Sequence, residues 1–290
     1  MTQIIQSFDD VAERYDAAFV DLWGCMHNGL TAYQQAVRAM RSFRARGGKV
    51  VLLTNSPRPR RSVEEQISQM GVPNDAWDVI ASSGDSARAA MFRGIVGKKV
   101  FFIGENNDNS FFEPLALITD PVDISIVSLE EAEGIICTGP FDAFADPDDL
   151  RPQLLYAKQK GLKLLCANPD IVVDRGETRE WCAGAVAQLY TKMGGTSLYF
   201  GKPHPPIYDL ARRRLAELGD VPGNPRIIGI GDGIRTDIQG AMGEDIDSLF
   251  ITGGLAAGET QTDEQPEQAA LDEFLAQNML SPTFAMGFLR

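Results

Sequence analysis

The chain has 290 residues, 44% of them hydrophobic, and a formal net charge of −13 from 27 basic and 40 acidic side chains. This length exceeds that of a usual single domain, so we expect two globular domains. The negative charge argues against a binding surface for nucleic acid or for an anionic membrane. Since no signal-like segment or membrane-spanning apolar stretch is evident, we expect a cytoplasmic protein.

Cysteine and histidine are too few and too scattered to indicate a structural metal site. The sequence contains four cysteines and two histidines, none at paired metal-ligand spacing: Cys25, Cys137, Cys166, Cys182, His27 and His204. This distribution argues against a zinc site. Reduced thiols in a cytoplasm are the simplest interpretation, with Cys25 a small packed residue.

The first element predicted from the sequence is a buried strand over 17–20, which Asp21 follows directly. Four apolar residues before an aspartate, with Gly24 soon after, are typical of a parallel strand that ends in a loop. The position places a carboxylate at the carboxyl edge of a sheet, where α/β proteins bind ligands. A helix is predicted over 31–46, ended by a pair of glycines.

A second strand, 49–53, leads into Thr54 and Asn55 ahead of a helix predicted from about 62 to 70. Hydroxyl, carboxamide and backbone N–H groups at a turn from strand to helix can hold an anion. The alternative, a plain helix cap by Ser56, stays open at this point.

The segment 82–198 is predicted to form a separate α/β domain inserted into the first. It carries its own alternation of apolar strands and amphipathic helices. The predicted strands are 99–103, 134–138 and 162–167, and the predicted helices are 148–160 and 179–193. The flanking parts, 1–81 and 199–290, then make one core.

Two more strand ends carry chemically suitable residues. The run 198–200 leads to Lys202, held between a glycine and a proline, and the run 226–230 leads to Asp232. Asp237 follows at the head of a helix. Two carboxylates five residues apart across a glycine turn suit a hard cation, although Asp237 can equally stabilise the helix N-terminus.

The remainder of the chain completes the predicted fold. A polar connection over 256–268 precedes a helix at 269–277 and a final strand within 283–289, interpreted as an edge strand. Strands that alternate with helices throughout predict an α/β fold: a doubly wound, Rossmann-like parallel sheet with an inserted α/β domain.

In their order and spacing, these four loops resemble the motifs of the haloacid dehalogenase superfamily of aspartate-nucleophile hydrolases. Within it, the chain is similar to the class IIA phosphatases of sugar phosphates and nitrophenyl phosphate, over roughly residues 15–255. The class features are Thr54-Asn55-Ser56, Ile80-Ala81-Ser82-Ser83 and Ala167-Asn168-Pro169-Asp170. The resemblance implies that 82–198 is a cap domain over the core.

The resemblance also implies a phosphoryl-transfer role for particular residues. Asp21 attacks phosphorus and forms an aspartyl-phosphate, while Thr54, Asn55 and Lys202 hold the phosphoryl oxygens. A carboxylate is repelled by a phosphate dianion, so such an attack requires positive charge beside it.

The same resemblance implies a Mg2+ cofactor. Its ligands are Asp21, the backbone carbonyl of Trp23 and Asp232, with Asp237 in support. In the inserted domain, Asn168 and Asp170 are the implied substrate-binding positions. The sequence supplies oxygen ligands of the kind that Mg2+ prefers.

Trp23 departs from the phosphatase pattern. The phosphatases carry an aspartate at this position, which protonates the leaving oxygen and activates the hydrolytic water. Tryptophan does neither, and loss of a positioned acid and base typically lowers the rate by about 100- to 10,000-fold. His27 in the same loop is the nearest candidate to replace it.

The leading interpretation is a Mg2+-dependent phosphatase acting on a small phosphorylated metabolite, with a sugar phosphate as the first choice. One alternative is a metal-independent dehalogenase, which would explain an aromatic residue at Trp23 but leave Asp232 and Asp237 without a task. Another is a phosphate-binding or regulatory protein of low turnover. Whether the chain forms a homo-oligomer stays open.

Overall fold

The computed structural model describes residues 2–105, 108–113, 120–175 and 178–290. The chain separates into two compact units. The first unit consists of Met1–Thr54, Glu64–Ala81 and Tyr208–Arg290, and the second of Asn55–Val63 and Ser82–Ile207. Helix α2 (Arg60–Gln69) has residues in both.

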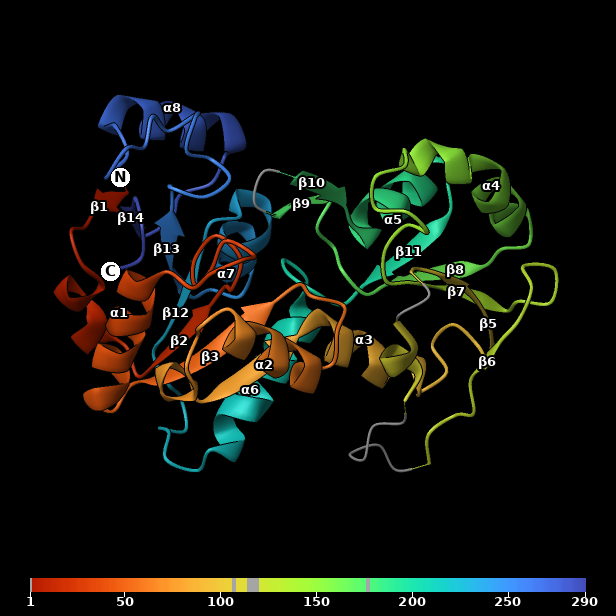
Figure 1. Ribbon diagram of the computed structural model, residues 1–290, viewed down its shortest axis with the longest axis horizontal. Coiled ribbons are helices and arrows are strands. Elements are labelled where there is room, and N and C mark those ends of the chain that lie inside the picture. The colour runs from red at the N-terminus through yellow and green to blue at the C-terminus, as the bar shows by residue number, and fades with distance from the viewer. Residues whose placement is uncertain (1, 106–107, 114–119, 176–177) are drawn as a thin grey trace. The chain divides into compact units, whose positions relative to one another are not determined.

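The first unit is built on a seven-stranded sheet with the order β1-β14-β13-β12-β2-β3-β4 (Figure 1). The pairings from β1 through to β3 are all parallel. Its strands are β1 (Gln3–Ile4), β2 (Ala17–Val20), β3 (Lys49–Thr54), β4 (Val79–Ser82), β12 (Ile227–Gly231), β13 (Asp247–Ile251) and β14 (Phe284–Met286).

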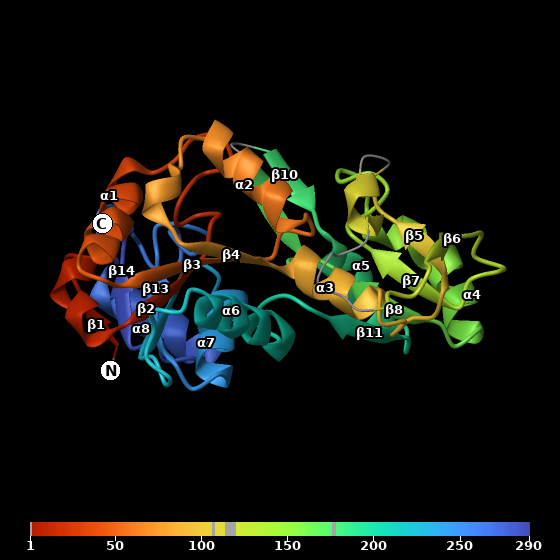
Figure 2. The same ribbon diagram turned by 90° about the horizontal axis from the view of Figure 1, so that it is seen from below.

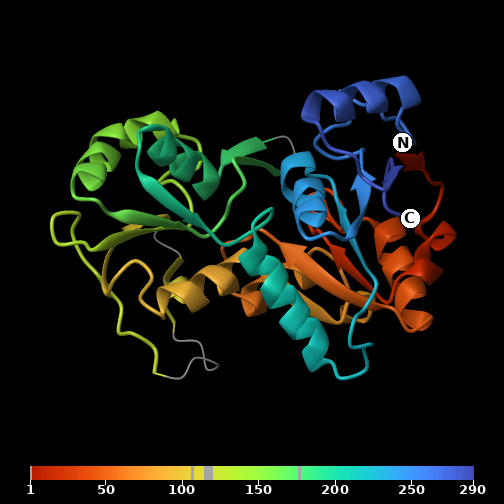
Figure 3. The same ribbon diagram turned by 180° about the vertical axis from the view of Figure 1, so that it is seen from behind.

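Helices cover both faces of this sheet, as a doubly wound fold requires. Helix α1 (Gln34–Ala45) lies on one face, and α6 (Pro205–Glu217) and α7 (Gln239–Gly243) lie on the other (Figures 2 and 3). In α1, Val37, Met40 and Phe43 are buried because their helical spacing brings them to one side. The predicted fold class is therefore confirmed.

The C-terminal helix of the first unit is α8 (Gln268–Asn278), close to its predicted limits. The strand after it was wrongly predicted at the sheet edge. Strand β14 lies between β13 and β1, because residues 3–4 pair with it in parallel. A two-residue strand shows no alternation of apolar and polar residues, so the sequence pattern could not indicate this last pairing.

The second unit contains a five-stranded sheet with the order β11-β8-β7-β5-β6, in which all four pairings are parallel. Its strands and helices are α3 (Ser83–Met91), β5 (Lys99–Ile103), β6 (Ser125–Ile126), β7 (Gly134–Cys137), α4 (Arg151–Gln159), β8 (Lys163–Cys166), α5 (Ala183–Lys192) and β11 (Thr196–Tyr199).

Alternate residues of these strands pack into separate cores on the two faces of the sheet. Ile135 and Leu164 pack with side chains of α4 and α5. Their chain neighbours Ile136 and Leu165 pack with side chains of α3. Because successive side chains of a strand point to opposite faces, continuous apolar strands of this kind require helices on both sides.

Residues 179–181 correct the predicted helix over 179–193. They belong to strand β10 (Thr178–Trp181), which pairs antiparallel with β9 (Val172–Arg175), and the helix α5 begins only at Ala183. The hairpin contains Val172, Val173, Thr178 and Trp181, and β-branched and aromatic residues favour strands. Across the described ranges, none of the helices is long and apolar enough to span a bilayer.

Two ion pairs of the second unit have the same aspartate-to-arginine spacing but opposite burial. Asp85 and Arg88 are each only 5% exposed, whereas the side chains of Asp148 and Arg151 are 55% and 54% exposed. Arg88 also donates from Nε to the carbonyl oxygen of Phe111, at 2.9 Å.

Replacement of Arg88 by methionine should therefore be much more damaging than the matched Arg151→Met change. Loss of one partner of a buried pair leaves an uncompensated charge, at about 3–5 kcal/mol, whereas an exposed pair contributes at most about 1 kcal/mol. Urea unfolding of both variants measures the difference. Equal losses of stability would contradict the assigned role of Arg88.

Candidate active site

Three of the predicted site residues lie at one edge of the sheet of the first unit. Asp21 follows β2, Thr54 is the last residue of β3, and Asp232 follows β12. These three strands are parallel neighbours, so their carboxyl ends coincide. The backbone N–H of Asp21 donates to the carbonyl oxygen of Ile230 on β12 at 2.8 Å, which fixes the two acidic loops side by side.

Asp21 and Asp232 form a compact group of potential metal ligands with Cys25. One ligand atom from each of the three residues lies within 4.8 Å of the others, and all three side chains are buried. Two buried carboxylates this close repel each other, and a cation relieves that repulsion. The pair of oxygen donors fits Mg2+, which makes Asp21 and Asp232 the residues that would hold it.

The carboxylate of Asp232 is fixed by close backbone approach on two sides. A Cβ atom built on Gly24 would lie 2.1 Å from Asp232 Oδ2, and one on Gly254 would lie 2.0 Å from it. The N–H of Leu255 donates to the same oxygen at 3.1 Å. Gly24 also has a φ of +76°, which favours glycine. The contribution of residues 254–255 was not predicted, because it comes from backbone atoms.

Asp237 acts on the loop rather than within that group of ligands. Its Oδ2 accepts hydrogen bonds from the N–H of Gly233 at 3.1 Å and from the hydroxyl of Thr236 at 3.4 Å. It therefore holds the glycine turn that presents Asp232. Its support of the metal stays a prediction.

The second unit joins three predicted site residues in one hydrogen-bond network. The carboxamide of Asn55 accepts from the backbone N–H of Lys202 at 2.7 Å and donates to the carbonyl oxygen of Lys202 at 3.2 Å. It also donates to Asp170 Oδ1 at 2.8 Å. A carboxamide has two N–H donors, and these two contacts use both. The geometry therefore makes Asn55 a clamp on the Lys202 loop, and its contact with phosphate stays a prediction.

Asn168 and Asp170 form the turn that this clamp holds. Asn168 Oδ1 accepts from the N–H of Asp170 at 3.0 Å, as in an asparagine-stabilised turn. Lys202 and Asn168 are both buried, at 2% and 8% exposure. The substrate contacts of this turn stay a prediction.

Trp23 is packed into its own loop. Its indole meets the imidazole of His27 edge to face, with ring centroids 5.3 Å apart. On the other side, a Cβ atom at Gly29 would lie 2.4 Å from the indole, and Gly29 has a φ of +86°. The loop is thus shaped around the tryptophan ring.

His27 is a poor replacement for the missing acid. Its ring is 2% exposed, and Nδ1 accepts a hydrogen bond from the N–H of Gly29 at 3.0 Å. Burial lowers the pKa of His27 from 6.5 to about 4. The imidazole is therefore neutral near pH 7, with its proton on Nε2, and supports the loop.

Comparison with known proteins agrees with this arrangement of strand ends. Residues 18–117 match the model of haloacid dehalogenase-like hydrolases, and residues 199–276 match a second, HAD-hydrolase-like model. A haloacid dehalogenase-like hydrolase of Brucella suis is 36% identical, with a TM-score of 0.84, and the match covers 99% of this chain and 100% of that one. The chain belongs to the haloacid dehalogenase-like hydrolase family.

More distant relatives of this family member carry more specific names. The 5′-nucleotidase YutF of Bacillus subtilis is 24% identical over 259 residues, which cover 88% of this chain and 94% of that protein. A possible sugar phosphatase of Cytophaga hutchinsonii shares the fold, with a TM-score of 0.76, 17% identity and coverage of 100% of both chains.

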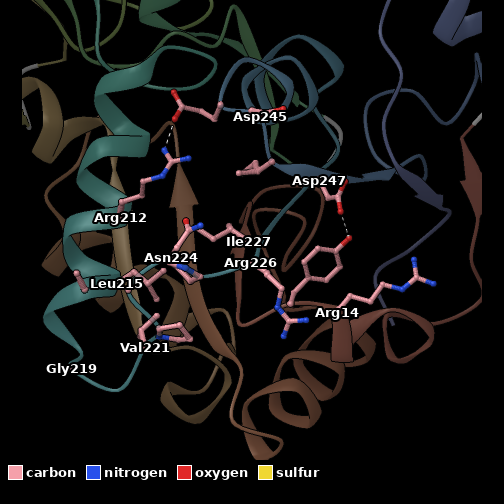
Figure 4. A pocket seen from close by; sticks show the side chains of 17 residues that line it. Arg14, Arg212, Leu215, Gly219, Val221, Asn224, Arg226, Ile227, Asp245 and Asp247 are labelled. Atoms are coloured by element: carbon pink, nitrogen blue, oxygen red, sulfur yellow. Dashed lines mark hydrogen bonds and ion pairs between the residues drawn. The ribbon is translucent and has the colours of Figure 1, made fainter.

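A large pocket of this hydrolase lies away from the acidic loops. Its volume is about 780 Å³, and it is lined by residues near the amino-terminal ends of β12 and β13, such as Ile227 and Asp247 (Figure 4). Two of its acidic side chains are already engaged: Glu244 pairs with Arg212, and Asp247 accepts from the hydroxyl of Tyr15 at 2.6 Å. Asp21, Thr54 and Asp232 lie at the opposite edge of the sheet, at the carboxyl ends of their strands.

The low pKa of His27 predicts a pH-dependent part of the stability. His27 is harder to protonate in the folded state than in the unfolded state. Its contribution to the free energy of unfolding is therefore complete above pH 6.5 and is lost as the pH drops toward about 4. The loss attributable to this group is on the order of 3 kcal/mol. Thermal unfolding of wild type and His27→Asn across this range should show a flatter profile for the variant, since asparagine keeps the acceptor. Parallel profiles would contradict the assignment.

Proposed function

We propose that this protein is a Mg2+-dependent phosphatase of small phosphorylated metabolites that works through an aspartyl-phosphate at Asp21. The observation that carries the proposal is the buried approach of Asp21 and Asp232 at the carboxyl edge of the sheet. A nucleophilic carboxylate beside a second carboxylate suits a reaction that requires a bound cation. The phosphatase names of relatives support the reaction type.

In the first step, a carboxylate oxygen of Asp21 forms a bond to phosphorus while the ester bond to the leaving oxygen breaks. The N–H of Leu22 donates to Asp21 Oδ1 at 2.8 Å and orients the carboxylate. Thr54 and the buried ammonium of Lys202 would hold the phosphoryl oxygens. When bound, Mg2+ would neutralise charge between the nucleophile and the phosphoryl group.

In the second step, water attacks phosphorus and the bond to Asp21 breaks, which releases phosphate and restores the carboxylate. Trp23 has no acid–base group, and Nδ1 of His27, the ring nitrogen that would accept a proton from this water, already accepts the N–H of Gly29. The leaving group must therefore take its proton from solvent, so esters of acidic alcohols should react fastest.

Substrate selection would come from residues 82–198, which we propose to act as a class IIA cap. The clamp of Asn55 on Asp170 ties the turn at Asn168 to the Lys202 loop within the second unit. A substrate group that contacts this turn would thus bind to the same hydrogen-bond network that positions Lys202. A sugar phosphate is the leading substrate class, and a nucleotide is the next.

The aromatic residue at position 23 favours one competing function, halide displacement from carbon without a metal. The buried Asp232 beside Asp21 counts against it, because that reaction has no use for a second carboxylate at the nucleophile. A phosphate-binding protein of low turnover is the third candidate, and neither phosphate nor halide release would indicate it.

Phosphate release from a panel of sugar phosphates, nucleotides and nitrophenyl phosphate tests the proposed function. Wild type should require added Mg2+ and lose activity with a chelator. Asp21→Asn should lose nearly all turnover, because the nucleophile is gone, while its unfolding temperature should not fall below that of wild type, since the change removes one of two carboxylates that repel each other. Phosphate release by Asp21→Asn at the wild-type rate would contradict the covalent mechanism. If wild type released halide from haloacids but no phosphate from the panel, the competing function would be supported.

The variants Trp23→Asp and Trp23→Asn, the matched control, test whether the lack of an acid at position 23 limits turnover. Both changes remove the indole, but only aspartate can transfer a proton. We expect Trp23→Asp to exceed Trp23→Asn by about 100-fold on an alkyl phosphate and by much less on nitrophenyl phosphate, whose leaving group needs no protonation. Equal rates of the two variants on both esters would show that proton transfer at this position does not limit turnover.

A further inference from the structure

The proposed Mg2+ site has a thiol beside its carboxylates that Mg2+ chemistry does not use. Cys25 Sγ lies within 4.8 Å of a carboxylate oxygen of Asp21 and of Asp232. Mg2+ takes oxygen ligands, whereas Zn2+ and Cd2+ bind thiolate sulfur strongly. The same three side chains therefore offer different ligand sets to hard and to softer cations.

We infer that Asp21, Cys25 and Asp232 together form an inhibitory site for thiophilic divalent cations such as Zn2+ and Cd2+. Bonds of roughly 2.0–2.3 Å to a tetrahedral cation place ligand atoms about 3.3–3.5 Å apart. The observed group, at no more than 4.8 Å, would have to contract by at most about 1.5 Å when the cation binds. Binding forms a metal–sulfur bond and releases the thiol proton to solvent.

Cys25 lies at a pocket through which a cation can reach the two acidic loops. The residue lines a surface pocket of about 400 Å³ together with Gly24, Tyr33 and Arg38. Burial and then the negative charge of Asp232 raise the pKa of Tyr33, which lines the same pocket.

Binding of such a cation would block the reaction in two ways. It would engage the nucleophilic oxygen of Asp21, and it would occupy the position that Mg2+ requires beside Asp232. This inhibitory consequence rests on the proposed function, whereas binding of the metal does not. The remaining cysteines, Cys137, Cys166 and Cys182, belong to the second unit and supply an internal control.

Titration of the full-length protein with Cd2+ tests the site by the ultraviolet sulfur-to-cadmium charge-transfer band. Wild type should show the band at one equivalent of cadmium, and excess Mg2+ should weaken the binding. Cys25→Ser should lose the band and bind cadmium at least about tenfold more weakly, since loss of even an indirect metal partner commonly has an effect of this size. Cys182→Ser should behave as wild type.

Asp232→Asn provides an independent arm if Cys25→Ser fails to fold, which circular dichroism would reveal. It should keep the thiol but weaken cadmium binding at least about tenfold, because one carboxylate ligand is lost. A band unchanged in Cys25→Ser, or binding indifferent to Asp232→Asn, would overturn the inference. Since the band is read without substrate, its result is separate from the success or failure of the phosphatase assays.

Discussion

The candidate site of the first unit depends on two buried carboxylates that the fold holds close together. Asp21 and Asp232 follow neighbouring parallel strands, and a backbone hydrogen bond from Asp21 to Ile230 fixes their loops in register. Like charges at this separation are unfavourable without compensation. Glycine at position 24 lets the backbone close against Asp232, so the strained arrangement is built into the chain before any ligand arrives.

The loop after Asp21 is built around the tryptophan ring. The ring of Trp23 meets the ring of His27 edge to face and packs against Gly29. The tryptophan is therefore a structural part of the loop. Under the proposed function, the site would retain nucleophile and cation chemistry while lacking a proton donor at position 23. That combination favours reactions in which the leaving group departs without help.

The sequence predicted the strand ends well because each is a buried apolar run followed at once by polar residues. Asp21, Thr54 and Asp232 were found by this signal, and the parallel sheet brings them to one edge. The assignment of roles came from family resemblance rather than from spacing. The interior position of β14 was not predictable, since its outer neighbour has only two residues.

Other features depend on contacts between residues far apart in the chain. The carboxamide of Asn55 bonds to the backbone of Lys202, 147 residues later, so no local pattern could distinguish a clamp from a phosphate ligand. The low pKa of His27 follows from burial, which is a property of the folded loop. The approach of Cys25 to the acids likewise required the folded structure, since its spacing in the sequence suggests no metal site.

The most direct test of the central claim is detection of the covalent intermediate. The protein would be mixed with nitrophenyl phosphate and Mg2+, quenched in acid, and analysed by intact-mass spectrometry and peptide mapping. Formation of the intermediate on this ester needs no proton donor, whereas its hydrolysis lacks a base, so a phosphoryl group should accumulate on Asp21. Turnover with no adduct, or with the phosphoryl group on another residue, would contradict the account.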